Sequence, residues 1–252
     1  MANINEFFTI QNTVRAVSDT EKEQTSDYLE CIRAFSKITY MSIYVIDYEK
    51  KGFEYVSDNP LFLCGHTAKE VQELGYAFYF KYVTPEDLDL LLKINNAGFS
   101  FYEDIPFEER KDYTISYDFH LKNQNGNVIL INQKLTPLFL TNDGKIWKAL
   151  CIISLSNEQS SGNVKISKKG SGVVFHYNIE KEYWKKVEET QLTSREKEIL
   201  LYSTRGYTIK EIADAIFVST DTVKFHRRKV FNKLEVANIA EAIAFATNNK
   251  LI

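Results

Sequence analysis

Two neighbouring segments near the end of the chain repeat their apolar residues at the period of an α-helix. The first, residues 208–216, carries one stripe at the spacing i, i+3, i+4 and i+7, formed by Ile209, Ile212, Ala213 and Ile216. The second, residues 219–234, places three apolar residues on one face, namely Val223, Val230 and Leu234. This pattern predicts two helices that pack their apolar faces together across a short turn.

Capping residues mark where these helices and two others begin. Three segments place a capping side chain three residues before a glutamate, an arrangement in which each side chain accepts a hydrogen bond from the other residue's backbone; they begin at Thr193, Thr208 and Asn238. Ser219 is a further N-cap residue, and Gly206 suits the left-handed conformation that ends a helix. Residues 191–252 are therefore expected to form four short helices.

The polar face of the 219–234 helix is mostly cationic. At about 100° per residue, the side chains that point away from the apolar face are Asp221, Lys224, Phe225, Arg228, Lys229 and Asn232. The helix carries five Lys or Arg against one Asp, a net charge of +4. A short positive helix that is held by a second helix fits the major groove of DNA.

Three segments of this region resemble a known family. They are LTSRE at 192–196, GYTIKEIA at 206–213 and STDTVKFH at 219–226. They are similar to the DNA-binding domain of the LuxR/FixJ regulators, a helix-turn-helix domain, and the similarity extends without a gap over 191–252. Ile209 departs from the family, which often has asparagine at that position.

The resemblance implies DNA contacts for eight residues. It implies that Lys224, Phe225 and Arg228 face the bases. Residues that hold the phosphates are expected to be Lys210, Thr220, Thr222, Arg227 and Lys229. His226 falls between the two faces of the helix and is expected to be packed or to face a phosphate.

The N-terminal segment, residues 1–36, reads as helical. A helix is expected over 3–35 with an interruption near Ser18, and its second part carries an apolar stripe formed by Tyr28, Leu29, Ile32 and Phe35. This stripe covers either its own domain or a second copy of the chain. We favour the second interpretation, a dimer contact.

Over residues 37–156 the spacing of apolar residues changes to the pattern typical of β-strands. Two short strands are expected at 41–46 and 53–56 around a turn, and three long antiparallel strands at 113–121, 128–138 and 146–155. Between them, the segment from Thr84 to Asp87 starts a long helix, with proline in the first turn and two acidic residues at its positive end. This element order resembles a PAS domain, so the fold class is α+β: a PAS-like antiparallel sheet with flanking helices, followed by the four-helix domain.

The PAS-like resemblance raises the question of a ligand. Many aromatic residues could line a pocket or simply fill the core: Phe78, Tyr79, Phe80, Tyr82, Phe99, Phe101, Tyr102, Tyr117 and Phe119. Cys64 lacks the sequence around a flavin-reactive cysteine, and haem binding by His66 or His120 stays open. We assign no cofactor and no metal, and expect this domain to sense a small molecule or a partner.

Residues 157–190 are expected to be a linker and a connecting helix. Residues 157–172 are rich in Ser, Gly and Lys, as linkers are. One added strand is expected at 173–177, and a charged helix at 179–189 that passes a change in the sensor to the DNA-binding domain of 191–252.

Composition narrows the class of protein. The net charge of −3 hides a split, because residues 191–252 carry ten Lys or Arg against seven Asp or Glu, which leaves −6 for the first 190 residues. The three cysteines, Cys31, Cys64 and Cys151, form no metal-ligand pattern and are expected to be reduced structural thiols. With no signal peptide and no apolar run of membrane length, a cytoplasmic protein is expected.

These observations predict a transcriptional regulator that binds double-stranded DNA as a homodimer and is able to contact RNA polymerase. No nucleophile elbow, phosphate loop or metal cluster indicates an enzyme. The acidic residues and the lysine of a receiver domain are also missing from their places. The alternative is a PAS-like redox or ligand-binding protein, or an interaction module whose basic helix binds a protein in place of DNA.

Overall fold

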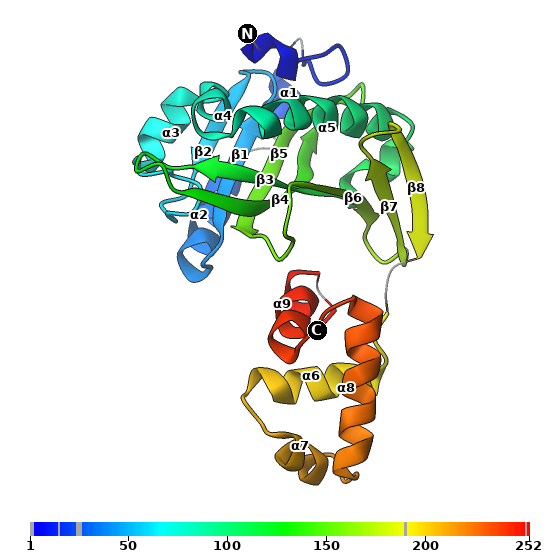
Figure 1. Cartoon of the computed structure of the whole chain (residues 1–252). Helices are drawn as coiled ribbons and strands as arrows, with labels where there is room; N and C mark the ends of the chain where they lie inside the picture. Colours follow the sequence, from blue (N-terminus) through cyan, green and yellow to red (C-terminus); the bar gives the residue numbers. More distant parts are fainter. Residues whose placement is uncertain (1–2, 15, 24–26, 189–190, 250) are drawn as a thin grey trace. The chain divides into compact units, whose positions relative to one another are not determined.

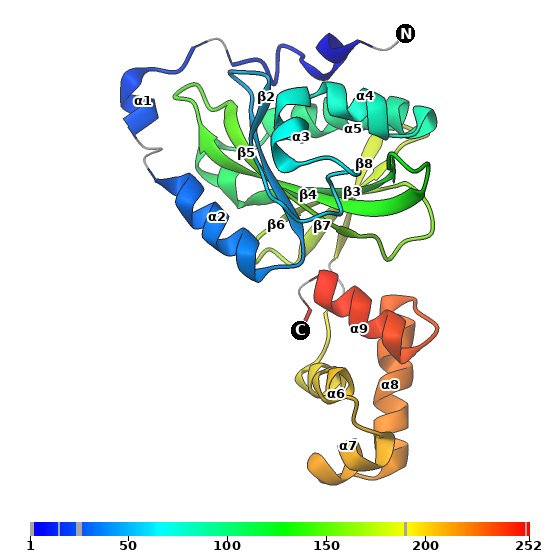
Figure 2. The same cartoon turned by 90° about the vertical axis from the view of Figure 1, so that its left-hand side faces the viewer.

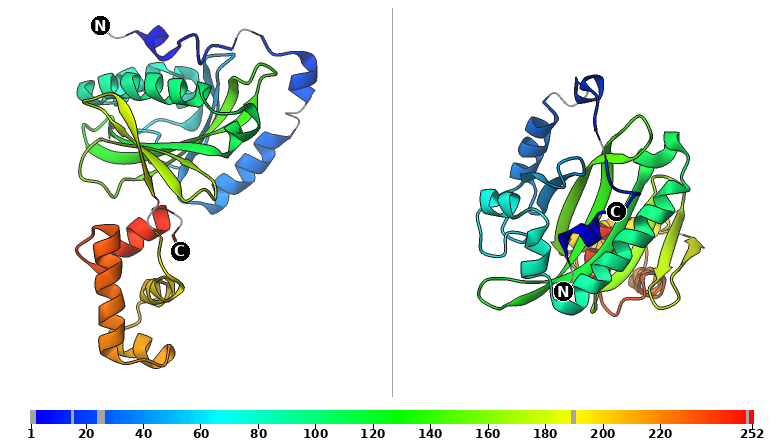
Figure 3. Two further views of the ribbon diagram at one scale, coloured as in Figure 1. Left: turned by 90° about the vertical axis from the view of Figure 1, so that its right-hand side faces the viewer. Right: turned by 90° about the horizontal axis from the view of Figure 1, so that it is seen from above.

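The chain folds as two units, Met1–Val187 and Glu188–Ile252. The computed structural model describes residues 3–14, 16–23, 27–188, 191–249 and 251–252. The first unit is built on a sheet with helices on both faces, and the second consists of helices (Figures 1 and 3).

Within the described residues, the first unit holds one eight-stranded sheet with the order β2-β1-β5-β4-β3-β6-β7-β8. The strands are β1 Ser42–Asp47, β2 Gly52–Val56, β3 Tyr113–Lys122, β4 Val128–Leu140, β5 Ile146–Leu155, β6 Gly162–Lys168, β7 Val173–Asn178 and β8 Tyr183–Glu188. The first five have the order 2-1-5-4-3 with helices between β2 and β3, which is the PAS-like fold that the sequence predicts. The five strands predicted in 37–156 agree with this structure to within about two residues at each end.

One face of the sheet is covered by helices that lie between β2 and β3 in the chain (Figure 2). They are α3 Ala68–Leu74, α4 Ala77–Tyr82 and α5 Pro85–Glu103, followed by the 3-10 helix η2 Phe107–Asp112. The N-cap residue of α5 is Thr84, as predicted, but its side chain makes no capping hydrogen bond. The carboxylate of Asp87 instead fixes this end of α5 to β3, because it accepts a hydrogen bond of 2.6 Å from the backbone N–H of His120.

Aromatic side chains fill the space between the sheet and these helices. Tyr44 of β1 stacks on Phe62 with ring centroids 4.4 Å apart, and its hydroxyl lies 2.6 Å from that of Tyr79 on α4. Gly98 allows α5 to approach β3 closely, because a Cβ at this position would lie 2.9 Å from the side chain of Ile115. All nine aromatic residues that the sequence offered as pocket or core pack in or against this core, and five of them also line a cavity: Tyr79, Phe99, Phe101, Tyr102 and Tyr117.

The predicted linker and connecting helix in 157–190 are wrong. Residues 162–188 form β6, β7 and β8, which continue the sheet from the edge of β3, and only the added strand at 173–177 was predicted correctly. The helical pattern of 179–189 gives way to tertiary packing, because Trp184 lies against Phe101 of α5 and Tyr177 of β7, with ring centroids 5.1 and 4.8 Å apart. The polar segment 157–172 thus lies inside the first unit.

The helix predicted over 3–35 with an interruption near Ser18 is wrong for residues 8–14 and is confirmed for 19–23 and 28–35. The segment forms the 3-10 helix η1 Ile4–Phe7 and the helices α1 Asp19–Glu23 and α2 Tyr28–Ile38. Between η1 and α1, the side chain of Asn12 donates to the carbonyl of Phe7 and accepts from the N–H of Thr9, both at 2.6 Å. These bonds satisfy the backbone without a helix, and Val14 and Val17 anchor the segment in the core.

α2 lies on the face of the sheet opposite α5 (Figure 2). Its first residue, Tyr28, donates a hydrogen bond to the carboxylate of Glu54 and packs its ring against Phe139 at 5.0 Å. Glu54 in turn binds the ammonium of Lys148 at 2.6 Å, and Asp47 lies 3.7 Å from the same ammonium. This buried charge cluster, formed by Tyr28, Asp47, Glu54 and Lys148, holds the start of α2 on strands β1, β2 and β5.

The second unit consists of four helices in the described part of the chain, as predicted: α6 Ser194–Thr204, α7 Ile209–Ala215, α8 Thr220–Leu234 and α9 Ile239–Asn248. The reciprocal caps predicted at Thr193 and Thr208 are both present. Asn238 caps α9, but Glu241 accepts its backbone bond from Ala237 rather than from Asn238. Gly206 follows α6 with φ +81°, the left-handed conformation predicted for it.

Candidate nucleic-acid interface and ligand cavity

α7 and α8 are held together by the apolar stripes that the sequence predicted. Val223 of α8 is fully buried in one cluster with Ile212, Ala213 and Ile216. Val230 and Leu234 of α8 are buried in a second cluster, against α6 and α9. The two clusters fix the orientation of α8 along its whole length, so Lys224, Phe225 and Arg228 point away from the core.

The turn between α7 and α8 is short. Phe217 takes a positive φ of 56° and leaves its ring 94% exposed. Ser219 then begins α8, since its hydroxyl accepts a hydrogen bond of 3.1 Å from the backbone N–H of Thr222. This geometry of helix, tight turn and helix is that of a helix-turn-helix motif.

The three predicted base-reading residues all lie on the exposed side of α8. The ammonium of Lys224 is 3.0 Å from Asp221, and Arg228 is exposed to solvent. Phe225 is 52% exposed, and the ammonium of Lys229 lies 4.5 Å from its ring centroid. The face therefore combines donors for base edges with an apolar ring that suits a thymine methyl group.

The predicted phosphate-holding residues surround this face with different degrees of exposure. Lys210 on α7, Thr220 and Lys229 are exposed, whereas Thr222 and Arg227 are partly buried. The hydroxyl of Thr222 lies 2.9 Å from that of Ser219, within the cap of α8. Burial lowers the pKa of Arg227, whose guanidinium lies over the ring of Phe231.

His226 lies between the two faces, as the sequence indicated. Its ring contacts that of Phe225 with centroids 5.5 Å apart. Its Nδ1 is buried without a hydrogen-bond partner among the described residues. This histidine is packed, and its position beside Phe225 supports the exposed ring.

Lys233 has a structural role that the sequence did not reveal. Its ammonium binds the buried carboxylate of Glu196 at 2.6 Å and the carbonyl of Gln191 at 3.2 Å, which ties α8 to the start of α6. Burial opposes the charge on Glu196, but hydrogen bonds from Lys233 and Thr193 prevail and hold the pKa of its carboxyl below the ordinary value.

Lys233→Met is therefore expected to destabilise the second unit by about 2 kcal/mol, because a buried carboxylate loses a charged hydrogen bond. A carboxyl with a depressed pKa stabilises the fold above its unfolded value of 4.5 and loses this effect as the pH falls. The loss in the variant should thus be largest at neutral pH and shrink in acid. Thermal unfolding between pH 3 and 7 measures it, with Lys210→Met as the exposed control; equal stability of both variants at pH 7 would contradict the assignment.

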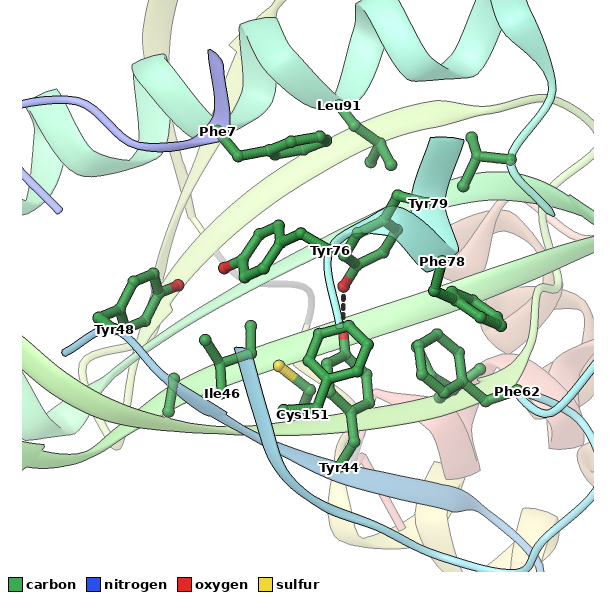
Figure 4. Packing of buried hydrophobic residues seen from close by; sticks show 14 of the residues in the cluster. Phe7, Tyr44, Ile46, Tyr48, Phe62, Tyr76, Phe78, Tyr79, Leu91 and Cys151 are labelled. Atoms are coloured by element: carbon green, nitrogen blue, oxygen red, sulfur yellow. Dashed lines mark hydrogen bonds between the residues drawn. The ribbon is translucent and has the colours of Figure 1, made fainter. Parts of the chain in front are cut away.

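The first unit contains a cavity between α5 and the sheet. Its free volume is about 80 Å³, and the residues around it include Phe7, Tyr48, Tyr76, Phe101, Tyr102 and Gln133. Tyr48 and Tyr76 turn their hydroxyl groups toward one another at its wall (Figure 4). Ile166 of β6 also lines it, so the strands added to the sheet help to close the cavity.

The histidines and cysteines of the first unit do not meet at a site. Nδ1 of His120 lies 2.7 Å from Asp87, His66 contacts the hydroxyl of Tyr82, and neither lines the cavity. Cys31 is exposed, so its predicted structural role is wrong, while burial raises the pKa of the Cys64 thiol to about 12. Among the described residues, no three His, Cys, Asp or Glu side chains are grouped to hold a metal ion.

These features define the class of each unit: a PAS-like domain followed by a helix-turn-helix domain. Residues 190–246 match the family described as bacterial regulatory proteins, luxR family. The response regulator protein VraR of Staphylococcus aureus is 43% identical over 61 residues, which are 24% of this chain and 29% of VraR. The chain thus matches less than a third of that relative. The C-terminal unit is a luxR-type helix-turn-helix domain.

Two solved structures extend the comparison to the first unit. One is the structure of VqmA from Vibrio cholerae in complex with a ligand and DNA. The similarity covers 89% of this chain and 89% of the VqmA chain at 16% identity, with a TM-score of 0.35. A PAS domain from Colwellia psychrerythraea covers 52% of this chain and 98% of its own length at 14% identity, with a TM-score of 0.38. In the described part of the chain, every helix is too short or too polar to cross a lipid bilayer.

Proposed function

We propose that the protein is a transcriptional regulator that binds double-stranded DNA as a homodimer and reads the major groove with α8. The observation that carries the proposal is the exposed cationic face of α8, held by two apolar clusters on its other side. Lys224, Phe225 and Arg228 read base edges in this proposal. Phosphates are bound by Lys210, Thr220, Thr222, Arg227 and Lys229, which give affinity without sequence preference.

Selection from a randomised duplex library with the purified full-length chain tests this function. We expect an enriched motif that the variant Lys224→Ala does not enrich. Absence of enrichment with a folded wild-type protein contradicts sequence-specific binding. In that case the alternative is that the basic helix α8 docks on an acidic protein. Binding of α8 to such a protein in the absence of DNA would support this alternative. A contact between the DNA-bound protein and RNA polymerase in the cytoplasm completes the proposal.

The proposed dimer uses the apolar face of α2. No described residue of this helix is buried, and Phe35 and Ile38 are 50% and 83% exposed. Large apolar side chains that stay exposed on a helix in one copy can be buried against a second copy. The start of α2 is meanwhile fixed to the sheet by the buried charge cluster, so the helix presents this face in a defined position.

The double variant Phe35→Glu/Ile38→Glu is expected to convert a dimer into a monomer, because each new carboxylate would be buried at the contact. Sedimentation velocity at micromolar concentration measures the change, with Phe107→Glu as a control at another half-exposed ring. A wild-type chain that sediments as a monomer would overturn the dimer. A double variant that remains dimeric would place the contact elsewhere.

The cavity and the end of the first unit share side chains, which supports a sensing role for the PAS-like domain. Phe101 lines the cavity and also contacts Phe175 and Trp184, with ring centroids 4.9 and 5.1 Å apart. Trp184 lies on β8, the strand that ends next to the division between the two units at Val187. A ligand that moves Phe101 therefore acts directly on the strand that leads to the DNA-binding domain.

A further inference from the structure

Two residues that line the cavity of the first unit each have a buried oxygen atom without a hydrogen-bond partner among the described residues. These atoms are the hydroxyl of Tyr102 and Oε1 of Gln133. Gln133 is 1% exposed, and its Nε2 donates a hydrogen bond of 2.6 Å to the hydroxyl of Tyr117. This bond fixes the amide and leaves Oε1 free to accept from another molecule.

Unpartnered buried oxygens are costly, and they are uncommon in folded proteins. On β4, Gln133 is followed two residues later by Leu135, which faces the same cavity, so an apolar side chain could occupy this position. The amide at this inward position is thus a feature that a bound molecule would use. A water molecule alone would not require the apolar and aromatic walls around it.

The charge of the lining residues and the volume of the cavity limit the class of molecule that the cavity can bind. Among the described residues that line the cavity, none carries a formal charge, so a charged ligand would be desolvated without a counter-ion. The free volume of about 80 Å³ is roughly half that of an engineered cavity of about 150 Å³ that takes up benzene. The resting cavity therefore suits a molecule smaller than benzene.

We propose that the cavity binds a small uncharged ring compound that donates an N–H or O–H to Oε1 of Gln133 and accepts a hydrogen bond from Tyr102. The aromatic walls stack on the ring, and Gln133 selects for the donor. This assignment rests on the proposed sensing function, for which it supplies the chemical class of the ligand.

Two five-membered rings of nearly equal size test the role of Gln133. Pyrrole has an N–H donor, whereas furan has an oxygen at the same position. Ligand-observed NMR titration of the full-length chain should show about tenfold tighter binding of pyrrole, because furan leaves Oε1 of Gln133 unpartnered. Gln133→Leu should reduce this ratio to about one, and the surface variant Gln159→Leu should leave it unchanged. Equal binding of the two rings to the wild-type chain, or no binding, overturns the proposal.

A second variant keeps the test valid if Gln133→Leu does not fold. Pyrazole adds a ring nitrogen that accepts a hydrogen bond, so Tyr102→Phe should weaken pyrazole binding about fivefold and leave pyrrole binding unchanged. An equal effect on both rings would contradict the role of Tyr102. DNA selection with the same protein is independent of these titrations. Enrichment of a motif without any ring preference would overturn the ligand class alone, and ring preference without enrichment would overturn DNA reading alone.

Discussion

Replacing Arg228 or Lys224 with alanine is expected to weaken binding to the preferred DNA site by about 1–3 kcal/mol, which is roughly a 5- to 150-fold loss of affinity. Both side chains lie on the exposed face of α8, where a major-groove base edge would meet them. A base-reading side chain loses specific hydrogen bonds on the preferred site, whereas random DNA loses only one charge. Titration of the selected duplex and of a scrambled duplex at one fixed salt concentration measures the two losses.

Two control variants distinguish the loss of base contacts from the loss of a positive charge. Lys197→Ala removes one exposed positive charge from α6 and should change both affinities little. Lys229→Ala removes a proposed phosphate contact, so it should weaken binding to both duplexes alike and lower the salt dependence by about one counter-ion. If Arg228→Ala behaves like Lys229→Ala, Arg228 holds a phosphate and its assignment to the bases fails.

Lys148→Ala is expected to cost the first unit about 3–5 kcal/mol of unfolding free energy. Lys148 is 4% exposed, and its ammonium is the cation that faces Glu54 and Asp47 in the buried charge cluster. Without it, the buried carboxylate of Asp47, whose pKa burial already raises, and the partly buried carboxylate of Glu54 lose their cation. Denaturant unfolding followed by tryptophan fluorescence measures the loss, because Trp147 and Trp184 both lie in this unit.

A version of the cluster that lacks both partners of its closest ion pair provides the matched control. The double variant Lys148→Met/Glu54→Leu removes both partners of the closest ion pair. It should recover most of the stability that Lys148→Ala loses, since well-packed apolar residues often replace buried ion pairs at little cost. Dimer formation should recover with it if the cluster positions α2. A cost below about 1 kcal/mol for Lys148→Ala would show that solvent reaches the cluster.

The sequence predicted elements whose own residues determine them. The stripes of α7 and α8 and the caps at Thr193, Thr208 and Ser219 are local signals, and the structure contains them at those positions. β6 was missed although Val164 and Ile166 alternate with polar residues, because two apolar positions in a polar segment also occur in linkers. The helix predicted in place of β8 failed because Trp184 packs on Phe101, more than 80 residues earlier in the chain.

The unpartnered amide in the cavity could not be predicted from the sequence for a different reason. Gln133 is a polar residue at an inward position of a long strand, which is a signal in the sequence. Whether its amide is satisfied depends on Tyr117, on a neighbouring strand, and on the space left by α5. Lys233 was likewise counted among the cations of α8, but its partner Glu196 lies on α6. The roles of Gln133 and Lys233 both depend on contacts between segments that are distant in the sequence.

The last strand of the sheet also sets the reach of the DNA-binding domain. β8 is the outermost strand and has β7 as its neighbour, so it is bonded along one edge only. Each residue that detaches from this edge adds about 3.3 Å to the tether between the units. Tether length determines the effective concentration of a second reading helix at the neighbouring half-site. An edge strand that detaches by a few residues would therefore change the half-site spacing that the proposed dimer tolerates, without any change in α8.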